Sequence, residues 1–163
     1  MKRAGKTAGD NDEVDLTGDG GILKKIVKEG TGDVIPNGVT AVVHYTGKFL
    51  DGKVFDSSVT RGQPFKFTVG ARQVILGWDK GVATMKKGEK CVLTCAPDYA
   101  YGNRGVGPIP GGSTLVFDVE LLDWNEGGQS FLGSATPVVT IILFIAFAIV
   151  ILRSMGGSGG KKE

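Results

Sequence analysis

The chain has 163 residues and a formal net charge of +2, with two cysteines and one histidine. This length allows one domain of ordinary size with attachments. The nearly balanced charge argues against a nucleic-acid partner, and a single histidine excludes a site that needs two imidazoles. We therefore expect neither a metal nor another cofactor.

Residues 1–20 are polar and rich in glycine, with basic residues at Lys2, Arg3 and Lys6 and acidic residues after them. So few large apolar groups cannot offset the entropy of ordering, which predicts a disordered arm. The basic residues could be a nuclear or nucleic-acid signal, but a solvated tail is the favoured interpretation. No apolar run follows them, so we expect no secretory signal.

The first strand candidate is Ile22–Lys28, and the next, Val42–Ser58, is the most informative stretch of the chain. Apolar and polar residues alternate along its first half, as in a half-buried strand, and Asp51-Gly52 predicts a tight turn. The returning strand would bring Phe55 close to Tyr45. Asp56, which follows, is either a cap for local backbone amides, as propensity favours, or a group aimed into a pocket.

His44 lies within this strand, and we interpret it as a packed or hydrogen-bonded residue. Cys91 and Cys95 lie in a later strand, KCVLTCA. Four residues along a strand put the two thiols on one face but about 13 Å apart, too far for a disulfide or a shared metal ion. They are interpreted as buried thiols of a reducing compartment.

Between these strands, PFKFTV at 64–69 alternates like a strand, and the apolar spacing of residues 70–85 predicts the domain's helix, which Gly77 and Gly81 should shorten. A Gly- and Pro-rich loop at 97–112 precedes the last strand, STLVFDVELLD. One helix and about five antiparallel strands predict an α+β domain over residues 21–124, with a curled sheet wrapped around one short helix.

Phe131 to Leu152 contains no charged residue. As a helix it would span about 33 Å against a hydrocarbon core of about 30 Å, which predicts a transmembrane helix at 135–153 between a linker at 125–134 and a polar tail at 154–163. The basic tail alone would put residues 154–163 in the cytosol. The missing signal instead favours a single-pass tail anchor with the domain facing the cytosol, on the endoplasmic reticulum first or the mitochondrial outer membrane second.

Several motifs together resemble the FKBP family of peptidyl-prolyl isomerases: VHYTGKFLDGKVFDSS, PFKFTVG, VILGWDKGV, PDYAYG, IP and TLVFDVELL. They occur in the family's order and approximate spacing, and the resemblance covers roughly Leu23 to Asp123. It implies an antiparallel sheet curled around one short helix, with an apolar pocket between helix and sheet. It also implies isomerase activity on Xaa-Pro segments of client proteins and binding of rapamycin-type macrolides.

The resemblance assigns roles to residues. Trp78 is similar to the family's indole floor, and the paired aromatic and acid of the pocket rim correspond to Phe55 and Asp56, with Arg61 as the partner of the acid. Tyr101 is similar to the loop hydroxyl that binds a carbonyl. The aromatic wall corresponds to Tyr45, Phe65 and Phe117. The helix entry corresponds to Val74 and Ile75, and the family uses the backbone N–H of the Ile75 position as a donor. The apolar loop residue over the pocket corresponds to Ile109.

Two departures bear on substrate preference and macrolide affinity: the loop at 102–110 is one residue shorter than in the family's small prototypes, and Gln73 replaces an acid found in some members. Three functions follow from the sequence. The leading one is a membrane-anchored isomerase; the alternatives are a non-catalytic adaptor that uses the same groove, and a packing role in an oligomer for the apolar segment.

Overall fold

The computed structural model describes residues 13–126; the predicted membrane span, its linker beyond residue 126 and the polar tail lie outside these residues. Nine strands, one α-helix and one 3₁₀ helix follow in chain order: β1 Glu13–Asp15, β2 Ile22–Lys28, β3 Thr31–Val34, β4 Thr40–Phe49, β5 Val54–Ser57, β6 Phe65–Thr68, α1 Leu76–Val82, β7 Lys86–Lys87, β8 Lys90–Cys95, η1 Pro97–Tyr99 and β9 Leu115–Asn125.

Strand β4 pairs with three other strands of a seven-stranded antiparallel sheet, whose order is β1-β2-β8-β9-β4-β5 with β6 also paired with β4. One edge of β4 pairs with β9 over its whole length, while the other edge pairs first with β6 and then with β5. Residues 41, 43, 45 and 47 are buried and their neighbours are not. The predicted period-2 strand and the Asp51-Gly52 hairpin are therefore confirmed, with Gly52 at φ +86°.

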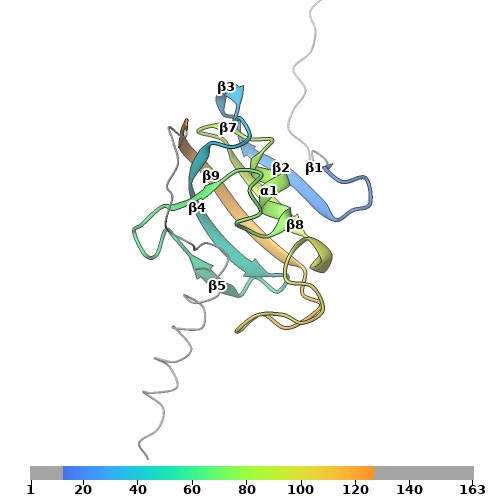
Figure 1. Ribbon diagram of the computed structural model, residues 1–163. Coiled ribbons are helices and arrows are strands. Elements are labelled where there is room, and N and C mark those ends of the chain that lie inside the picture. Colours follow the sequence, from blue (N-terminus) through green and yellow to red (C-terminus); the bar gives the residue numbers. More distant parts are fainter. Residues whose placement is uncertain (1–12, 127–163) are drawn as a thin grey trace, which may run out of the picture.

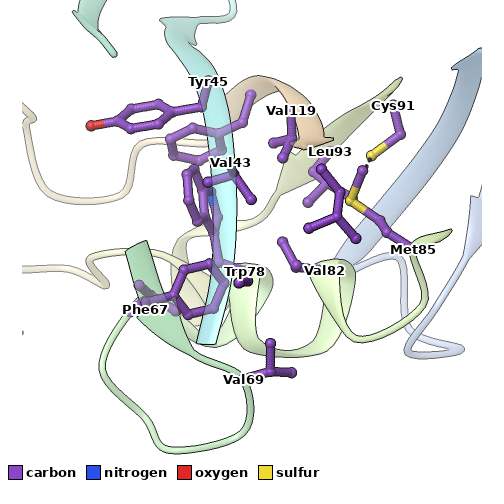
Figure 2. Packing of buried hydrophobic residues seen from close by; sticks show 14 of the residues in the cluster. Val43, Tyr45, Phe67, Val69, Trp78, Val82, Met85, Cys91, Leu93 and Val119 are labelled. Carbon is purple, nitrogen blue, oxygen red and sulfur yellow. Dashed lines mark hydrogen bonds between the residues drawn. The ribbon is translucent and has the colours of Figure 1, made fainter. Parts of the chain in front are cut away.

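Helix α1 lies across one face of this sheet (Figure 1). Its inward side carries Trp78 and Val82, which Figure 2 shows beside Val43, Leu93 and Val119 of the sheet. The helix has seven residues, shorter than the predicted stretch of 70–85. Residues 70–75 form a loop instead, because the Asp79 carboxylate accepts the N–H groups of Gly70 and Arg72 at 3.0 and 2.8 Å and holds that segment outside the helix.

The structure corrects two expectations about the elements. The predicted five or so strands are nine, because β1 is added at one edge and β3 and β7 form a separate two-stranded sheet. The prediction of a disordered arm over residues 1–20 is also wrong for residues 13–20, while residues 1–12 lie outside the described residues. Residues 13–15 pair with β2, and Asp15 accepts the backbone N–H groups of Thr17, Gly18 and Gly20, so side-chain hydrogen bonds order a segment that is poor in apolar residues.

The strand residues with reactive side chains lie as predicted. Cys91 and Cys95 are free, buried on one face of β8, and the Cys91 thiol lies 3.7 Å from the Met85 sulfur (Figure 2). His44 Nδ1 lies 3.0 Å from the Ser58 hydroxyl. Within residues 13–126, none of the helices has the length and apolar character that crossing a bilayer requires.

Candidate active site

A pocket opens between α1, the sheet and the loop after β8, with a free volume of about 340 Å³ that includes the solvent at its mouth. Sequence reasoning placed every one of its lining residues in the site. They are Tyr45, Phe55, Asp56, Val74, Ile75, Trp78, Tyr101 and Phe117. These residues come from β4, β5, the loop before α1, α1 itself, the loop after η1 and β9, so the tertiary fold brings together side chains up to 72 positions apart in the chain.

Trp78 of α1 is 4% exposed and stands edge-on to several rings. Its ring centroid lies 4.9 Å from that of Tyr45, 5.5 Å from Phe117 and 6.0 Å from Phe65. Such edge-to-face contacts place the positive edge of one ring against the negative face of another and fix the ring orientations. The result is a rigid aromatic floor that closes the pocket at the bottom.

The rim of the pocket carries a hydrogen-bonded trio. The Tyr45 hydroxyl donates to Asp56 Oδ2, and Arg61 Nη1 pairs with Asp56 Oδ1. Arg61 Nη2 also donates to the Tyr45 hydroxyl at 3.1 Å, and the guanidinium carbon lies 5.8 Å from the Tyr45 ring centroid. Asp56 thus belongs to the pocket, and the alternative of a backbone cap is wrong, because both of its oxygens are used by side chains.

Burial raises the pKa of the Tyr45 hydroxyl, and its hydrogen bond to Asp56 raises it further. Burial also raises the pKa of the Tyr101 hydroxyl, to about 12, with a smaller contribution from the Asp56 charge. For Arg61, burial lowers the pKa, but the hydrogen bonds to Tyr45 and Asp56 outweigh it and leave the pKa raised. At neutral pH both tyrosines therefore keep their protons and can donate hydrogen bonds.

Three predicted site residues lie outside the pocket lining. Phe65 packs behind the lining and stands edge-on to Tyr45, with the two ring centroids 6.0 Å apart. Arg61 is linked to the lining by its ion pair with Asp56. Ile109 is 2% exposed and pairs with Val106 to close the loop at 102–112 into a compact hairpin. Gln73, the departure at the helix entry, accepts the Thr68 N–H at 2.8 Å and so holds β6 against the loop before α1.

Sequence reasoning missed two residues that shape the site. Gly47 in β4 leaves the space that Phe55 and Phe117 occupy, since a Cβ at this position would come within 2.6 Å of Phe55 and 3.1 Å of Phe117. A glycine inside a strand signals such a close approach. Ser58 is fully buried, and its hydroxyl binds the Tyr45 N–H at 2.8 Å, which anchors the strand beside the pocket. No local pattern marks Ser58, because its partner lies on another strand.

Residues 32–122 match the family model of FKBP-type peptidyl-prolyl cis-trans isomerases. The chain belongs to this family. It is 54% identical over 106 residues to FK506-binding protein 1 of Dictyostelium discoideum, covering 64% of this chain and 99% of that protein. It is also 54% identical over 118 residues to FK506-binding protein 59 of Drosophila melanogaster, covering 71% of this chain but only 27% of that longer relative.

The crystal structure of FkpA from Escherichia coli is also similar to this FKBP-type chain, with a TM-score of 0.64 and 43% sequence identity over 71% of this chain and 53% of that one. The sequence-based prediction of family, of the curled sheet with one short helix and of isomerase activity is confirmed. The domain is an FKBP-type peptidyl-prolyl cis-trans isomerase.

Proposed function

We propose that the isomerase acts in the aromatic pocket described above, and that it does so by desolvating and twisting the Xaa-Pro amide. The observation that carries this proposal is the lining itself, which is apolar apart from one carboxylate and two tyrosine hydroxyls. A proline ring fits such an apolar space, and burying its three methylenes at ~0.8 kcal/mol each contributes about 2 kcal/mol. Binding is therefore weak, which suits an enzyme that must release each client.

The barrier to rotation, ~18–20 kcal/mol, comes from amide resonance, which gives the planar amide a charge-separated character. The twisted amide has lost this character and is less polar. The pocket, with Trp78, Phe117 and Tyr45, solvates the planar form less well than water does, so it stabilises the twisted form relative to the planar one. The chemistry requires no nucleophile and no cofactor.

The polar groups at the rim position the peptide. Tyr101 is placed in the lining with its proton retained, and it would donate to a carbonyl next to the proline. No acceptor within residues 13–126 binds the Ile75 N–H, so this group would hold a second carbonyl. Asp56, fixed by Tyr45 and Arg61, would lie beside the carbonyl that rotates.

We propose Xaa-Pro segments of client proteins as substrates and macrolides of the FK506 and rapamycin type as competing ligands. The relatives named above are called FK506-binding proteins, and their names support the macrolide part of this proposal. The test measures cis-trans turnover of an Ala-Leu-Pro-Phe peptide by the full chain. Exchange NMR monitors this turnover with and without macrolide. Turnover suppressed at equimolar macrolide supports the pocket. A folded chain without turnover would instead favour the adaptor alternative, and turnover that macrolide leaves unchanged would place the reaction elsewhere.

We further propose that the segment at 135–153 anchors the domain in a membrane, with the domain on the cytosolic side. The support is the uncharged run from Phe131 to Leu152 and the pair of free thiols, which are typical of reducing compartments. The endoplasmic reticulum is the first candidate membrane and the mitochondrial outer membrane the second. Fractionation with protease protection tests this: the domain should be cleaved by protease added to intact vesicles.

A further inference from the structure

A second groove lies next to the pocket, on the outward side of α1. By the same measure as the pocket, its free volume is about 880 Å³. Its lining comes from α1 and the two residues after it, the loop before the helix, the loop between β3 and β4, and the N-terminal loop. The residues are Leu16, Asn37, Gly70, Arg72, Leu76, Asp79, Lys80, Ala83 and Thr84. None of the sequence-based site predictions included this groove.

One wall of the groove is Leu16, in a segment that lies before residues 32–122, the range that the family model matches. This segment is held in place from several sides. The Leu16 N–H donates to Ile22 O at 2.9 Å, and Asp19 accepts the Tyr99 hydroxyl at 2.8 Å. The groove therefore has a wall that hydrogen bonds hold in place.

The opposite wall presents Arg72 in an unusual backbone conformation. Its φ is +55°, which costs a non-glycine residue energy. Asp79 maintains this conformation by accepting the N–H groups of Gly70 and Arg72, so both of its carboxylate oxygens are engaged by backbone. No carboxylate within residues 13–126 forms an ion pair with the Arg72 guanidinium, which is exposed.

The groove and the pocket are lined by residues that are neighbours in the chain. Val74 and Ile75 line the pocket, while Arg72 before them and Leu76 after them line the groove. Leu76 is 42% exposed, an apolar surface at the junction. A peptide whose carbonyl is bound by the Ile75 N–H would lie one residue of chain from Leu76, at the edge of the groove.

We propose that this groove is an extended substrate subsite, and that Arg72 selects client segments with an acidic side chain a few residues from the Xaa-Pro bond. The inference rests on the proposed pocket and adds a specificity that the pocket lacks. An exposed cation facing a carboxylate on a bound peptide contributes a modest preference, about two- to fivefold. Because the pair is exposed, salt weakens it.

The experiment measures kcat/KM of the full chain for a peptide series around Ala-Leu-Pro-Phe, with glutamate or glutamine placed in turn at each position from two to four residues on either side of the proline. The expected result is a two- to fivefold preference for glutamate over glutamine at one position, reduced at 0.5 M NaCl. Arg72→Gly should abolish the preference. Glycine adopts a φ of +55° without strain, so this variant keeps the loop conformation, which its thermal unfolding checks.

Lys28→Ala is the matched control, since Lys28 is an exposed cation at the end of β2 and lies in neither cavity. It should retain the preference of the unmodified chain. Turnover of the glutamine peptides without any preference for glutamate would overturn the inference and leave the proposed function intact. A preference that survives in Arg72→Gly would also overturn it. No turnover of any peptide would overturn the proposed function and the subsite together.

Discussion

At the scale of single residues, Asp56 is the charged member of the pocket lining, and its side-chain partners explain how a carboxylate is accommodated there. Its side chain is 17% exposed, and both oxygens are paired, one with the Tyr45 hydroxyl and one with Arg61. A carboxylate held by two donors is fixed in one position, as the proposed rotation of a client amide beside it would require. In the proposed mechanism the Asp56 carboxylate would orient the substrate, while the Tyr45 ring of the same trio belongs to the aromatic floor.

Asp56→Leu should lower kcat/KM for an Ala-Leu-Pro-Phe peptide by about tenfold or more, because the variant lacks the fixed carboxylate charge beside the carbonyl that rotates. The fold should persist, because the aromatic floor does not depend on the carboxylate. The measurement is peptide turnover together with near-UV circular dichroism. Asp33→Leu, an exposed acid of β3, is the control and should leave turnover unchanged. Equal turnover in both variants would exclude a role for Asp56.

Burial raises the pKa of the Cys91 and Cys95 thiols from 9.0 to about 12. The folded state therefore keeps these protons at pH values where the unfolded chain releases them. The free energy of unfolding should be unaffected by these thiols below about pH 9 and should fall between about pH 9 and pH 12. Urea unfolding at pH 8, 9.5 and 11 measures this slope. In the double variant Cys91→Ala/Cys95→Ala the slope should be shallower, and an identical slope would contradict the assignment.

At the scale of elements, helix α1 contains two glycines because it must approach the sheet closely. Gly77 faces Cys95, and a Cβ on Gly77 would lie 2.4 Å from the Cys95 sulfur and 3.1 Å from Tyr99 O. Gly81 faces Leu93, where a Cβ would come within 2.6 Å of Cδ1. Both glycines lower helix propensity by about 1 kcal/mol each, and the close packing of Trp78 against the sheet outweighs this cost.

Gly77→Ala should therefore destabilise the domain by about 1–3 kcal/mol, although alanine favours the helix, because the new methyl group overpacks the contact with β8. Gly81→Ala should cost less, because the clashing atoms belong to the end of a single side chain. Chemical unfolding of the two variants measures the difference. If Gly77→Ala is as stable as the unmodified chain, the prediction is wrong and the helix can shift away from the sheet.

The N-terminal loop is an element whose order depends on a few carboxylates. Hydrogen bonds from the Thr17 and Gly20 N–H groups, among others, lower the pKa of Asp15 from 3.8 to about 2. Its contribution to order is present above about pH 4 and lost as the pH falls towards 2. Asp15→Asn should therefore speed hydrogen exchange of the Ala96 N–H, which donates to Gly21 O at 2.9 Å, at neutral pH. Unchanged exchange would mean that β1 pairing alone holds the loop.

At the scale of the whole molecule, the domain ends at β9, and the uncharged run begins a few residues beyond the described part of the chain. If Phe131 to Leu152 crosses a bilayer, the full chain should stay with membranes after extraction at alkaline pH, because the cost of moving this segment into water is large. A chain ending at residue 126 should be recovered in the supernatant. Release of the full chain by carbonate would favour the alternative of a packing helix in an oligomer.

Three local patterns carry the prediction of the fold: the alternation along β4, the Asp51-Gly52 turn and the 3.6-residue spacing before Met85. Because these patterns are local, the sequence by itself determined the α+β class, the main strands and the short helix. The family motifs added the site residues, and the fold brings all of these into the pocket lining except Arg61, Phe65 and Ile109. Local patterns carry no information about partners on other strands. The resemblance implied Arg61 as the partner of Asp56, but only the tertiary structure decided that Tyr45 is its second partner and that Ser58 anchors Tyr45. It alone also ordered residues 13–20 and opened a groove at Arg72, since both depend on contacts between segments distant in the chain.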